Sequence, residues 1–191
     1  MSVLPIITYG HPTLRKKGEP VSRFDPALKQ LAANMVETMH AAEGIGLAAQ
    51  QVNLALQFCV IDLRGCDWVF DFELNGTRPP FDLIMPMALA NPVVTPIPEP
   101  VLTESEGCLS FPALHGDIDR PDRIMVHYQD LEGQENTLTC SGMLSRCIQH
   151  EVDHLNGILY IDRMQRDSLA AIDRDLKQLK KRTRRELKKK N

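Results

Sequence analysis

The sequence lacks the features that mark several large classes of protein. It contains no run of about eighteen apolar residues, so a membrane-spanning helix is not expected. Its first residues have neither the basic start and apolar core of a secretory signal nor the Arg- and Ser-rich character of a transit peptide, which predicts a cytoplasmic protein. Its five cysteines are irregularly spaced and include no C-x-x-C pair, so we expect reduced thiols rather than a disulfide framework.

Phosphate-binding motifs are also absent. The segment 44–52 contains Gly44 and Gly46, but it continues neither as G-x-G-x-x-G nor as G-K-[ST], which disfavours a nucleotide-binding loop. The small residues there indicate either a tight turn or a place where another backbone approaches closely. No internal repeat or linker divides the chain, and its 191 residues are enough for one domain with a core.

Charge is unevenly distributed along the chain. The sequence has 22 Lys and Arg against 25 Asp and Glu, a net charge of −3, yet residues 166–191 hold eleven of the cations and only four of the anions. We therefore expect one domain over residues 1–165 that continues into a basic C-terminal helix over residues 166–191. An acidic body with a basic end suggests a polyanionic partner, and a solvated helix end explains the same pattern.

Three stretches have the apolar period of a helix. Residues 25–42 are predicted to form a helix because Asp25 can cap it and a proline suits its first position. Residues 143–155 repeat apolar side chains at helical spacing and are followed by an Asn-Gly stop signal. The third helix, residues 167–189, is polar and basic. Its predicted docking face consists of Leu169, Ile172, Leu176 and Leu179.

Strands are predicted elsewhere from alternation and from turn residues. Residues 56–63 form an apolar run typical of a buried strand, and residues 124–128 and 136–139 are predicted to pair through a turn. The alternating aromatic residues of the segment 68–74 predict a further strand. Seven of the thirteen prolines lie in the segment 79–100, which predicts loops with short edge strands there.

The strongest chemical signal is the H-E-x-x-H motif of His150, Glu151 and His154. On a helix, residues four apart lie on one face, so the two imidazoles suit one divalent metal ion and the glutamate can act on a water as general base. Two histidines in an amphipathic helix are often only well-bonded polar residues, so this interpretation depends on a third ligand. We expect an α+β fold in which this central helix packs against antiparallel β-sheets and the C-terminal helix lies outside.

Three sources of a third ligand compete. A third histidine, as in H-E-x-x-H-x-x-G-x-x-H, is disfavoured because Tyr160 occupies its position. A downstream carboxylate would come from Asp173 or Asp175, within the basic helix. Upstream, Cys108 follows a glycine in a segment predicted to turn or to lie at a sheet edge, and a thiolate is a strong ligand for a borderline divalent ion. Spacing alone does not choose between Cys108 and Cys147.

Three stretches together resemble the signature motifs of the peptide deformylases. They are Gly44-Ile-Gly-Leu-Ala-Ala-Gln-Gln51, Glu106-Gly-Cys-Leu-Ser110 and Gln149-His-Glu-Val-Asp-His154, in the family's order, and the resemblance covers about residues 5–165. It implies a cytosolic amide hydrolase that removes the formyl group from the N-terminal N-formylmethionine of newly made polypeptides and releases formate. It also implies one divalent metal ion per chain, Fe(II) in cells, with zinc, nickel or cobalt acceptable in preparations.

The resemblance assigns a role to each matching residue. The implied metal ligands are Cys108, His150 and His154. The implied catalytic groups are Glu151, Gln51 and the backbone N–H of Leu109. The residues implied to contact the substrate are Gly44, Ile45, Gly46, Glu106 and Cys147. In this scheme the glutamate moves a proton from the attacking water to the leaving amine, and the amide and the N–H donate to the developing oxyanion.

The sequence departs from the family pattern in three places. His115 stands where many members have an arginine near the substrate main chain, and Arg146 puts a polar group near the implied methionine pocket. Residues 64–88 are longer than in compact bacterial members and would form a lid, a dimer contact or a surface excursion. Family members can approach the ribosome through a C-terminal helix, so residues 166–191 are expected to contact RNA phosphate, in a monomer or a dimer that binds neither DNA nor a membrane.

Two other functions fit parts of the pattern. A zinc endopeptidase shares the metal ion and the glutamate but cleaves internal peptide bonds. A non-enzymatic RNA-binding module with a structural metal ion would need four protein ligands, and the sequence offers no obvious fourth.

Overall fold

Helices and strands alternate irregularly along the chain in the computed structural model, which describes residues 2–66, 69–97 and 100–190. The helices are α1 (Pro26–Ala41), α2 (Phe81–Ile84), α3 (Gly142–Leu155) and α4 (Arg166–Lys190). The strands are β1 (Gly46–Ala48), β2 (Phe58–Ile61), β3 (Phe72–Leu74), β4 (Met87–Pro96), β5 (Val101–Gly107), β6 (His115–Pro121), β7 (Ile124–Gln129) and β8 (Glu135–Cys140). Short 3-10 helices lie at Pro12–Arg15, Ala49–Val52 and Tyr160–Asp162.

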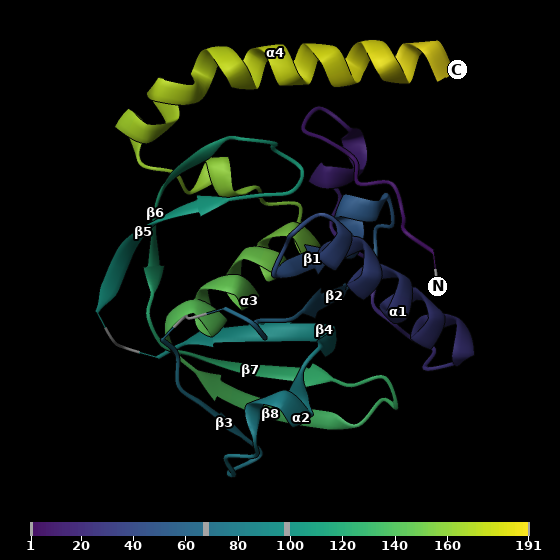
Figure 1. Ribbon diagram of the computed structural model, residues 1–191, viewed down its shortest axis with the longest axis vertical. Helices are drawn as coiled ribbons and strands as arrows, with labels where there is room; N and C mark the ends of the chain where they lie inside the picture. The colour runs from purple at the N-terminus through teal and green to yellow at the C-terminus, as the bar shows by residue number, and fades with distance from the viewer. Residues whose placement is uncertain (1, 67–68, 98–99, 191) are drawn as a thin grey trace.

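The strands form two antiparallel sheets around α3. The larger sheet has the strand order β1-β2-β4-β7-β8-β3, and β5 pairs with β6 in a separate hairpin. Figure 1 shows α3 between the hairpin and the larger sheet, with α4 lying across the outside of the molecule. The predicted α+β fold, with a central H-E-x-x-H helix and an outer C-terminal helix, is confirmed.

Strand β2 is apolar throughout because both faces of the sheet are covered. Cys59 and Ile61 belong to a core cluster that includes side chains of α3, whereas Phe58 and Val60 belong to a second cluster that includes side chains of α1. Successive residues of a strand point to opposite faces, so the two clusters lie on the two sides of the sheet. The buried strand predicted for residues 56–63 is confirmed.

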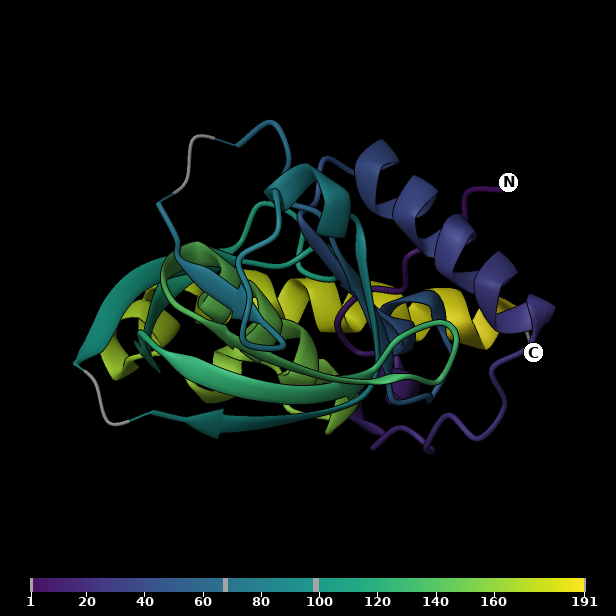
Figure 2. The ribbon, with the colours of Figure 1, turned by 90° about the horizontal axis from the view of Figure 1, so that it is seen from below.

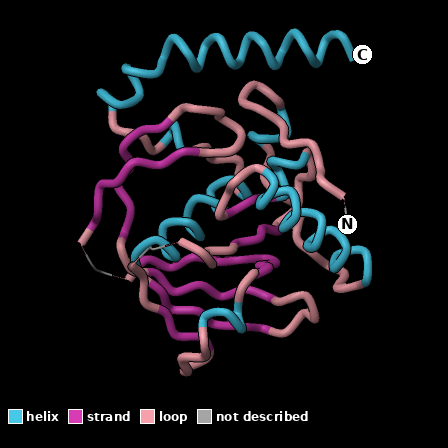
Figure 3. The backbone as a smooth tube through the Cα atoms, viewed as in Figure 1, coloured by secondary structure: helices cyan, strands magenta, loops and turns pink. Residues whose placement is uncertain are grey.

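The N-terminus of α1 and the docking of α4 match the predictions. Asp25 accepts hydrogen bonds from the N–H groups of Ala27 and Leu28 at 3.0 and 3.2 Å, and a proline fills the first position of α1. The predicted docking face of α4 belongs to a third core cluster with residues of β6 and of the N-terminal arm. Figure 3 shows α4 as one long helix, and Figure 2 shows it running behind the body of the molecule in the view from below.

The proline-rich segment 79–100 differs from its prediction. Instead of loops with short edge strands it contains the turn of helix α2 and the ten-residue strand β4, which lies inside the sheet between β2 and β7. Pro92 lies where the register with β7 shifts between Ala90 and Val93, and Pro96 is the last residue of the strand. Neither proline therefore interrupts a regular ladder of hydrogen bonds, and the prediction of edge strands was wrong.

The segment 64–88 contributes one edge of the larger sheet. Its predicted strand over 68–74 is shorter than expected: β3 covers Phe72–Leu74 and pairs with β8, while Trp68 lies outside the described residues. Whether 64–88 acts as a lid or a dimer contact stays a prediction, as does the division of the domain at residue 165. None of the helices in the described part of the chain combines the length and the apolar character that crossing a membrane requires.

Candidate active site

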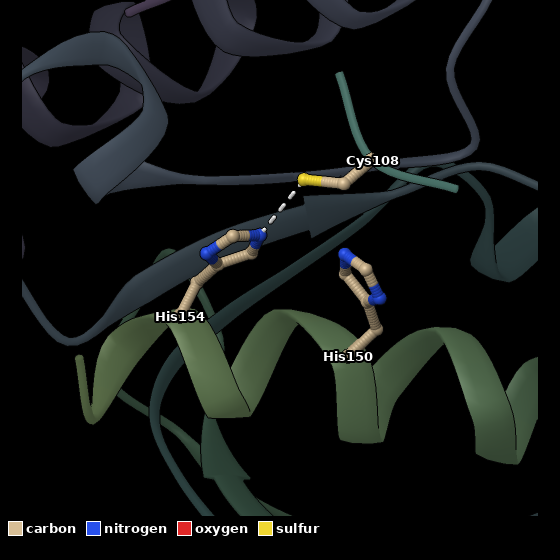
Figure 4. A group of neighbouring side chains, drawn as sticks. All are labelled: Cys108, His150 and His154. Atoms are coloured by element: carbon tan, nitrogen blue, oxygen red, sulfur yellow. Dashed lines mark hydrogen bonds between the residues drawn. The ribbon is translucent and has the colours of Figure 1, made fainter. Parts of the chain in front are cut away.

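A thiol and two imidazoles meet between α3 and the end of β5. His150 and His154 project from one face of α3, and Cys108 directly follows β5. The Sγ atom of Cys108 is 3.2 Å from Nε2 of His154, and one ligand atom from each of the three residues lies within 4.8 Å of the others. Figure 4 shows the three side chains directed toward a common point.

The other candidates for a third ligand lie elsewhere. The Sγ atom of Cys147 faces the carbonyl oxygen of Ile45, at 3.6 Å. Asp173 and Asp175 are exposed on α4. Among the described residues, the choice that spacing left open therefore falls on Cys108.

Glu106 fixes the orientation of the His150 ring. Its Oε2 atom accepts a hydrogen bond from Nδ1 of His150 at 2.9 Å, which leaves Nε2 for a ligand. Burial by itself raises the pKa of the Glu106 carboxyl, but the bonds from His150 and Arg120 outweigh it and hold this pKa well below its usual range. The carboxylate therefore stays charged and continues to accept the hydrogen bond from the His150 ring.

Arg120 links the hairpin to the metal helix. Its Nε and Nη2 atoms donate to Glu106 at 2.6 and 3.0 Å, and its Nη1 atom donates to Asp153 at 2.8 Å. Arg163 donates to both oxygens of Asp153, at 2.6 Å each, so the chain of ion pairs reaches the protein surface. The network fixes the position of the Glu106 carboxylate and thereby the orientation of the His150 ring.

The sequence analysis missed Arg120, although a signal was present. In β6 the buried residues Gly116, Ile118 and Arg120 alternate with the exposed residues His115, Asp117 and Asp119, so Ile118 and Arg120 lie on the inward face. A charged residue on the inward face of an alternating strand needs a buried partner of opposite charge. That reasoning would have predicted an ion pair at Arg120.

Glu151 is buried beside the two histidines. Burial raises the pKa of this carboxyl to about 7, and its Oε2 atom has no hydrogen-bond partner among the described residues. Gly46 makes room for it, because a Cβ atom on Gly46 would lie 2.4 Å from Oε1 of Glu151 and 2.9 Å from Sγ of Cys147. Gly44 is constrained in the same way, since its Cβ atom would lie 2.7 Å from Cδ1 of Leu109.

Two further hydrogen-bond donors belong to residues beside Cys108. The side chain of Gln51 is held because its Oε1 atom accepts the N–H of Ala48 at 2.8 Å, and its Nε2 atom then lies 3.5 Å from Sγ of Cys108. Within the described part of the chain, the backbone N–H of Leu109 meets no acceptor. An amide and an N–H placed in this way can receive negative charge on a substrate oxygen.

A cavity of about 820 Å³ joins these groups. Its lining includes nearly every residue that the sequence analysis selected: Gly44, Ile45, Gly46, Gln51, Glu106, Cys108, Leu109, Cys147, His150 and Glu151. His154 lies behind this lining, 1% exposed. Residues from three distant parts of the chain therefore share one cavity.

The residues at the bottom of the cavity fit a divalent transition metal. A thiolate and two imidazoles are the donors that such an ion prefers in a site with an open position. Burial lowers the pKa of His154, whereas for His150 the hydrogen bonds to Cys108 and Glu106 outweigh burial and raise the pKa. A metal ion would displace the proton from each nitrogen that it occupies. The carboxylate behind His150 is the usual second partner of a metal-binding histidine.

Comparison with known proteins identifies the family. The family model described as polypeptide deformylase matches residues 3–169. The chain belongs to the polypeptide deformylase family. The predicted membership and the prediction of an amide-hydrolysing enzyme are thereby confirmed, at the level of the family.

Individual deformylases are similar over almost the whole chain. The peptide deformylase of Opitutus terrae is 56% identical over 182 residues, which cover 95% of each chain, and that of Methylacidiphilum infernorum is 41% identical over 179 residues, 94% of each. Among solved structures, Arabidopsis thaliana peptide deformylase 1B with an inhibitor has a TM-score of 0.82 at 31% identity, over 96% of this chain and 93% of that one. The Thermus thermophilus peptide deformylase has a TM-score of 0.79 at 36% identity, over 95% and 99%.

Two of the three positions expected to depart from the deformylase pattern, His115 and Arg146, line the cavity. His115 is exposed at the mouth of the cavity, and its ring packs so closely on Gly107 that a Cβ atom there would lie 2.6 Å from it. Arg146 is buried, and it donates to Glu106 at 2.8 Å and pairs with Glu104 at 2.9 Å. Its polar atoms are thus occupied within the protein, and it ties the hairpin to α3.

Proposed function

We propose that this protein hydrolyses the formyl group from the N-terminal N-formylmethionine of newly made polypeptides and releases formate. The observation that carries the proposal is the convergence of a thiol, two imidazoles, an unpartnered buried carboxylate, the Gln51 amide and the backbone N–H of Leu109 at one cavity, in a member of the deformylase family. Neither the endopeptidase nor the RNA-binding alternative accounts for this combination together with the family.

Cys108, His150 and His154 would hold one divalent metal ion, Fe(II) in cells, with zinc, nickel or cobalt in preparations. Such an ion supplies a Lewis acid that acidifies a water molecule and polarises a carbonyl oxygen. Glu106 and, through it, Arg120 keep the His150 ring in the orientation that this role needs.

Glu151 moves the proton. Its unpartnered Oε2 atom accepts a proton from the attacking water, whose oxygen adds to the formyl carbon. When the carbon–nitrogen bond breaks, Glu151 returns the proton to the amine. The products are formate and a free N-terminal methionine.

Gln51 and Leu109 stabilise the charge that develops on the formyl oxygen. The hydrogen bond from Ala48 to Oε1 of Gln51 holds its Nε2 donor beside the thiol of Cys108, so the amide is preorganised near the reacting carbon. The N–H of Leu109 provides the second hydrogen bond.

The open edges of two strands would align the substrate. Strand β1 ends the larger sheet and β5 pairs only with β6 among the described strands, and residues next to both edges line the cavity. A peptide added beside Gly44, Ile45 and Gly46 would pair through its backbone as an extra strand. Its methionine side chain would then lie against Glu106 and Cys147.

The test is formate release from formyl-Met-Ala-Ser by protein purified without oxygen. Glu151→Gln should retain the metal ion and lose activity by roughly 100- to 10,000-fold, because a positioned acid–base group contributes about that much. Glu73→Gln, which changes an exposed carboxylate of β3, is the matched control and should keep full activity. Cleavage of casein without formate release would instead identify an endopeptidase.

The basic helix α4 would bring the enzyme to the ribosome in the cytosol, as a monomer or a dimer. The support is the clustering of exposed cations on α4. Deleting the helix is a poor test, because Leu176, Leu179 and Thr183 are buried and the deletion would open the core. Replacing exposed cations by glutamate and measuring co-sedimentation with ribosomes at low salt tests the contact, and unchanged binding would exclude it.

A further inference from the structure

A second cavity adjoins the mouth of the active-site cavity. It measures about 750 Å³ and lies between the loop 112–114 and helix α4. Pro112 and Ala113 line both cavities, so the two spaces meet at this loop. Ala113 adopts a left-handed backbone conformation, with φ 61°, which marks the loop as tightly bent where the cavities join.

The wall contributed by α4 is cationic. It carries four exposed cations and two exposed anions. The cations are Lys181, Arg182, Arg185 and Lys189, and the anions are Asp175 and Glu186. Among the described residues none of these four cations takes part in an ion pair, in contrast to Lys177, which pairs with Asp173 at 2.6 Å. The cations are therefore available to a ligand.

The position of this wall relative to the active site is fixed by packing. Thr183 of α4 is 2.7 Å from the hydroxyl of Thr8, and Lys180 lies 5.5 Å from the centre of the Tyr9 ring. Tyr9 in turn stacks on Phe111, with ring centres 4.9 Å apart, and Phe111 lines the active-site cavity. A ligand that leaves the active site past this loop therefore meets a preformed cationic surface.

We propose that the polypeptide segment downstream of the formylmethionine enters this second cavity, where α4 favours acidic side chains. The inference rests on the proposed deformylase activity, which places the formyl group beside Cys108 and leaves the rest of the peptide to exit through the cavity mouth. An extended chain advances about 3.4 Å per residue, so its fourth to sixth residues lie roughly 10 to 17 Å from the first. Substrate selection is thus shared between the methionine and a short acidic stretch that follows it.

The experiment compares three hexapeptide amides of the form formyl-Met-Ala-Ser-X-X-X, in which X is Asp, Asn or Lys. We expect kcat/KM at low ionic strength to be about five- to tenfold higher for the Asp peptide than for the Lys peptide, with the Asn peptide between them. Each exposed charge pair is weak, but the attractions of several cations of the second cavity add together. The difference in kcat/KM should lie in KM, because the residues of the second cavity contact no reacting atom. At about 1 M salt, where the screening length is about 3 Å, the ratio should approach one.

Charge reversal at two pairs of positions distinguishes an effect of the second cavity from an effect of the total charge of α4. Arg182→Glu/Lys189→Glu changes two side chains that line the second cavity, whereas Arg184→Glu/Lys188→Glu changes the charge equally on a different face of α4. With each variant's rate normalised to its own rate on formyl-Met-Ala-Ser, the first pair should abolish or invert the preference for Asp. The second pair should retain most of it.

Each outcome decides the proposal. Equal rates on the three hexapeptides, or the same loss of preference in both charge-reversed variants, would overturn it. So would weaker binding of Arg182→Glu/Lys189→Glu to ribosomal RNA without any change in peptide preference, which would assign this face to nucleic acid. Failure to deformylate formyl-Met-Ala-Ser would be a different result, since it would contradict the proposed function itself.

Discussion

Replacing Arg120 by methionine should destabilise the protein and weaken its metal site together. The side chain is 3% exposed and bridges two carboxylates, those of Glu106 and Asp153. Removing one partner of a buried ion pair costs about 3 to 5 kcal/mol, because it leaves the other charge buried. Glu106 keeps its bond from Arg146 and Asp153 keeps its pair with Arg163, so we expect a loss near the lower end, about 3 kcal/mol.

The loss should be measured as the free energy of unfolding in urea and as Tm. For a chain of this size, about 3 kcal/mol lowers Tm by roughly 6 to 12 °C. Glu106 also orients His150, so metal affinity, measured by transfer to a coloured chelator, should fall about 10- to 100-fold.

Arg163→Met provides the matched control. Its side chain is 43% exposed, so the loss of its ion pair with Asp153 should cost at most about 1 kcal/mol and leave metal affinity unchanged. The reasoning is refuted if Arg120→Met unfolds at the same urea concentration as Arg163→Met, or if it loses stability while holding its metal ion as tightly as the unmodified protein.

Two further predictions follow from individual contacts. Gly46→Ala should reduce kcat by at least about 100-fold, because the new Cβ atom would displace the Glu151 carboxylate that acts as general base. Gly76→Ala is the control: its Cβ atom would meet no neighbour, so it should lower the free energy of unfolding and leave kcat unchanged. Burial raises the pKa of Asp162, but the hydrogen bond from Arg15 outweighs burial, so the pKa is lowered overall. The ionised Asp162 therefore stabilises the fold fully above its unfolded-state pKa of about 4, and this stabilisation disappears as pH falls through its folded-state pKa. Urea titrations should therefore show Asp162→Asn to be less stable than the unmodified protein at pH 6, with the difference shrinking below about pH 4; a difference that grows in acid would contradict this.

Local signals in the sequence predicted the helices well. Asp25 caps α1 and a proline opens it, so the helix start depends on neighbouring residues alone. The apolar stripe of α3 specifies both its burial and the common face of His150 and His154. Such features need no knowledge of what lies across the fold.

Features that depend on distant parts of the chain were not predictable in the same way. Pro92 disfavours an interior strand as long as only the sequence is considered. It is tolerated because the register of β4 with β7 shifts between Ala90 and Val93, and that shift depends on the distant strand β7. The choice of Cys108 over Cys147 required knowing that β5 ends beside α3. Arg120 could have been suspected from alternation, but its two partners lie 14 and 33 residues away.

The measurement that most directly tests the central claim is the metal content of two cysteine variants, purified without oxygen and assayed for formate release from formyl-Met-Ala-Ser. The unmodified protein and Cys147→Ala should each hold one divalent ion per chain, because Cys147 faces Ile45 rather than the histidines. Cys108→Ala should lose the ion and release no formate. A Cys108→Ala protein that keeps its full metal content and still deformylates the peptide would contradict the account.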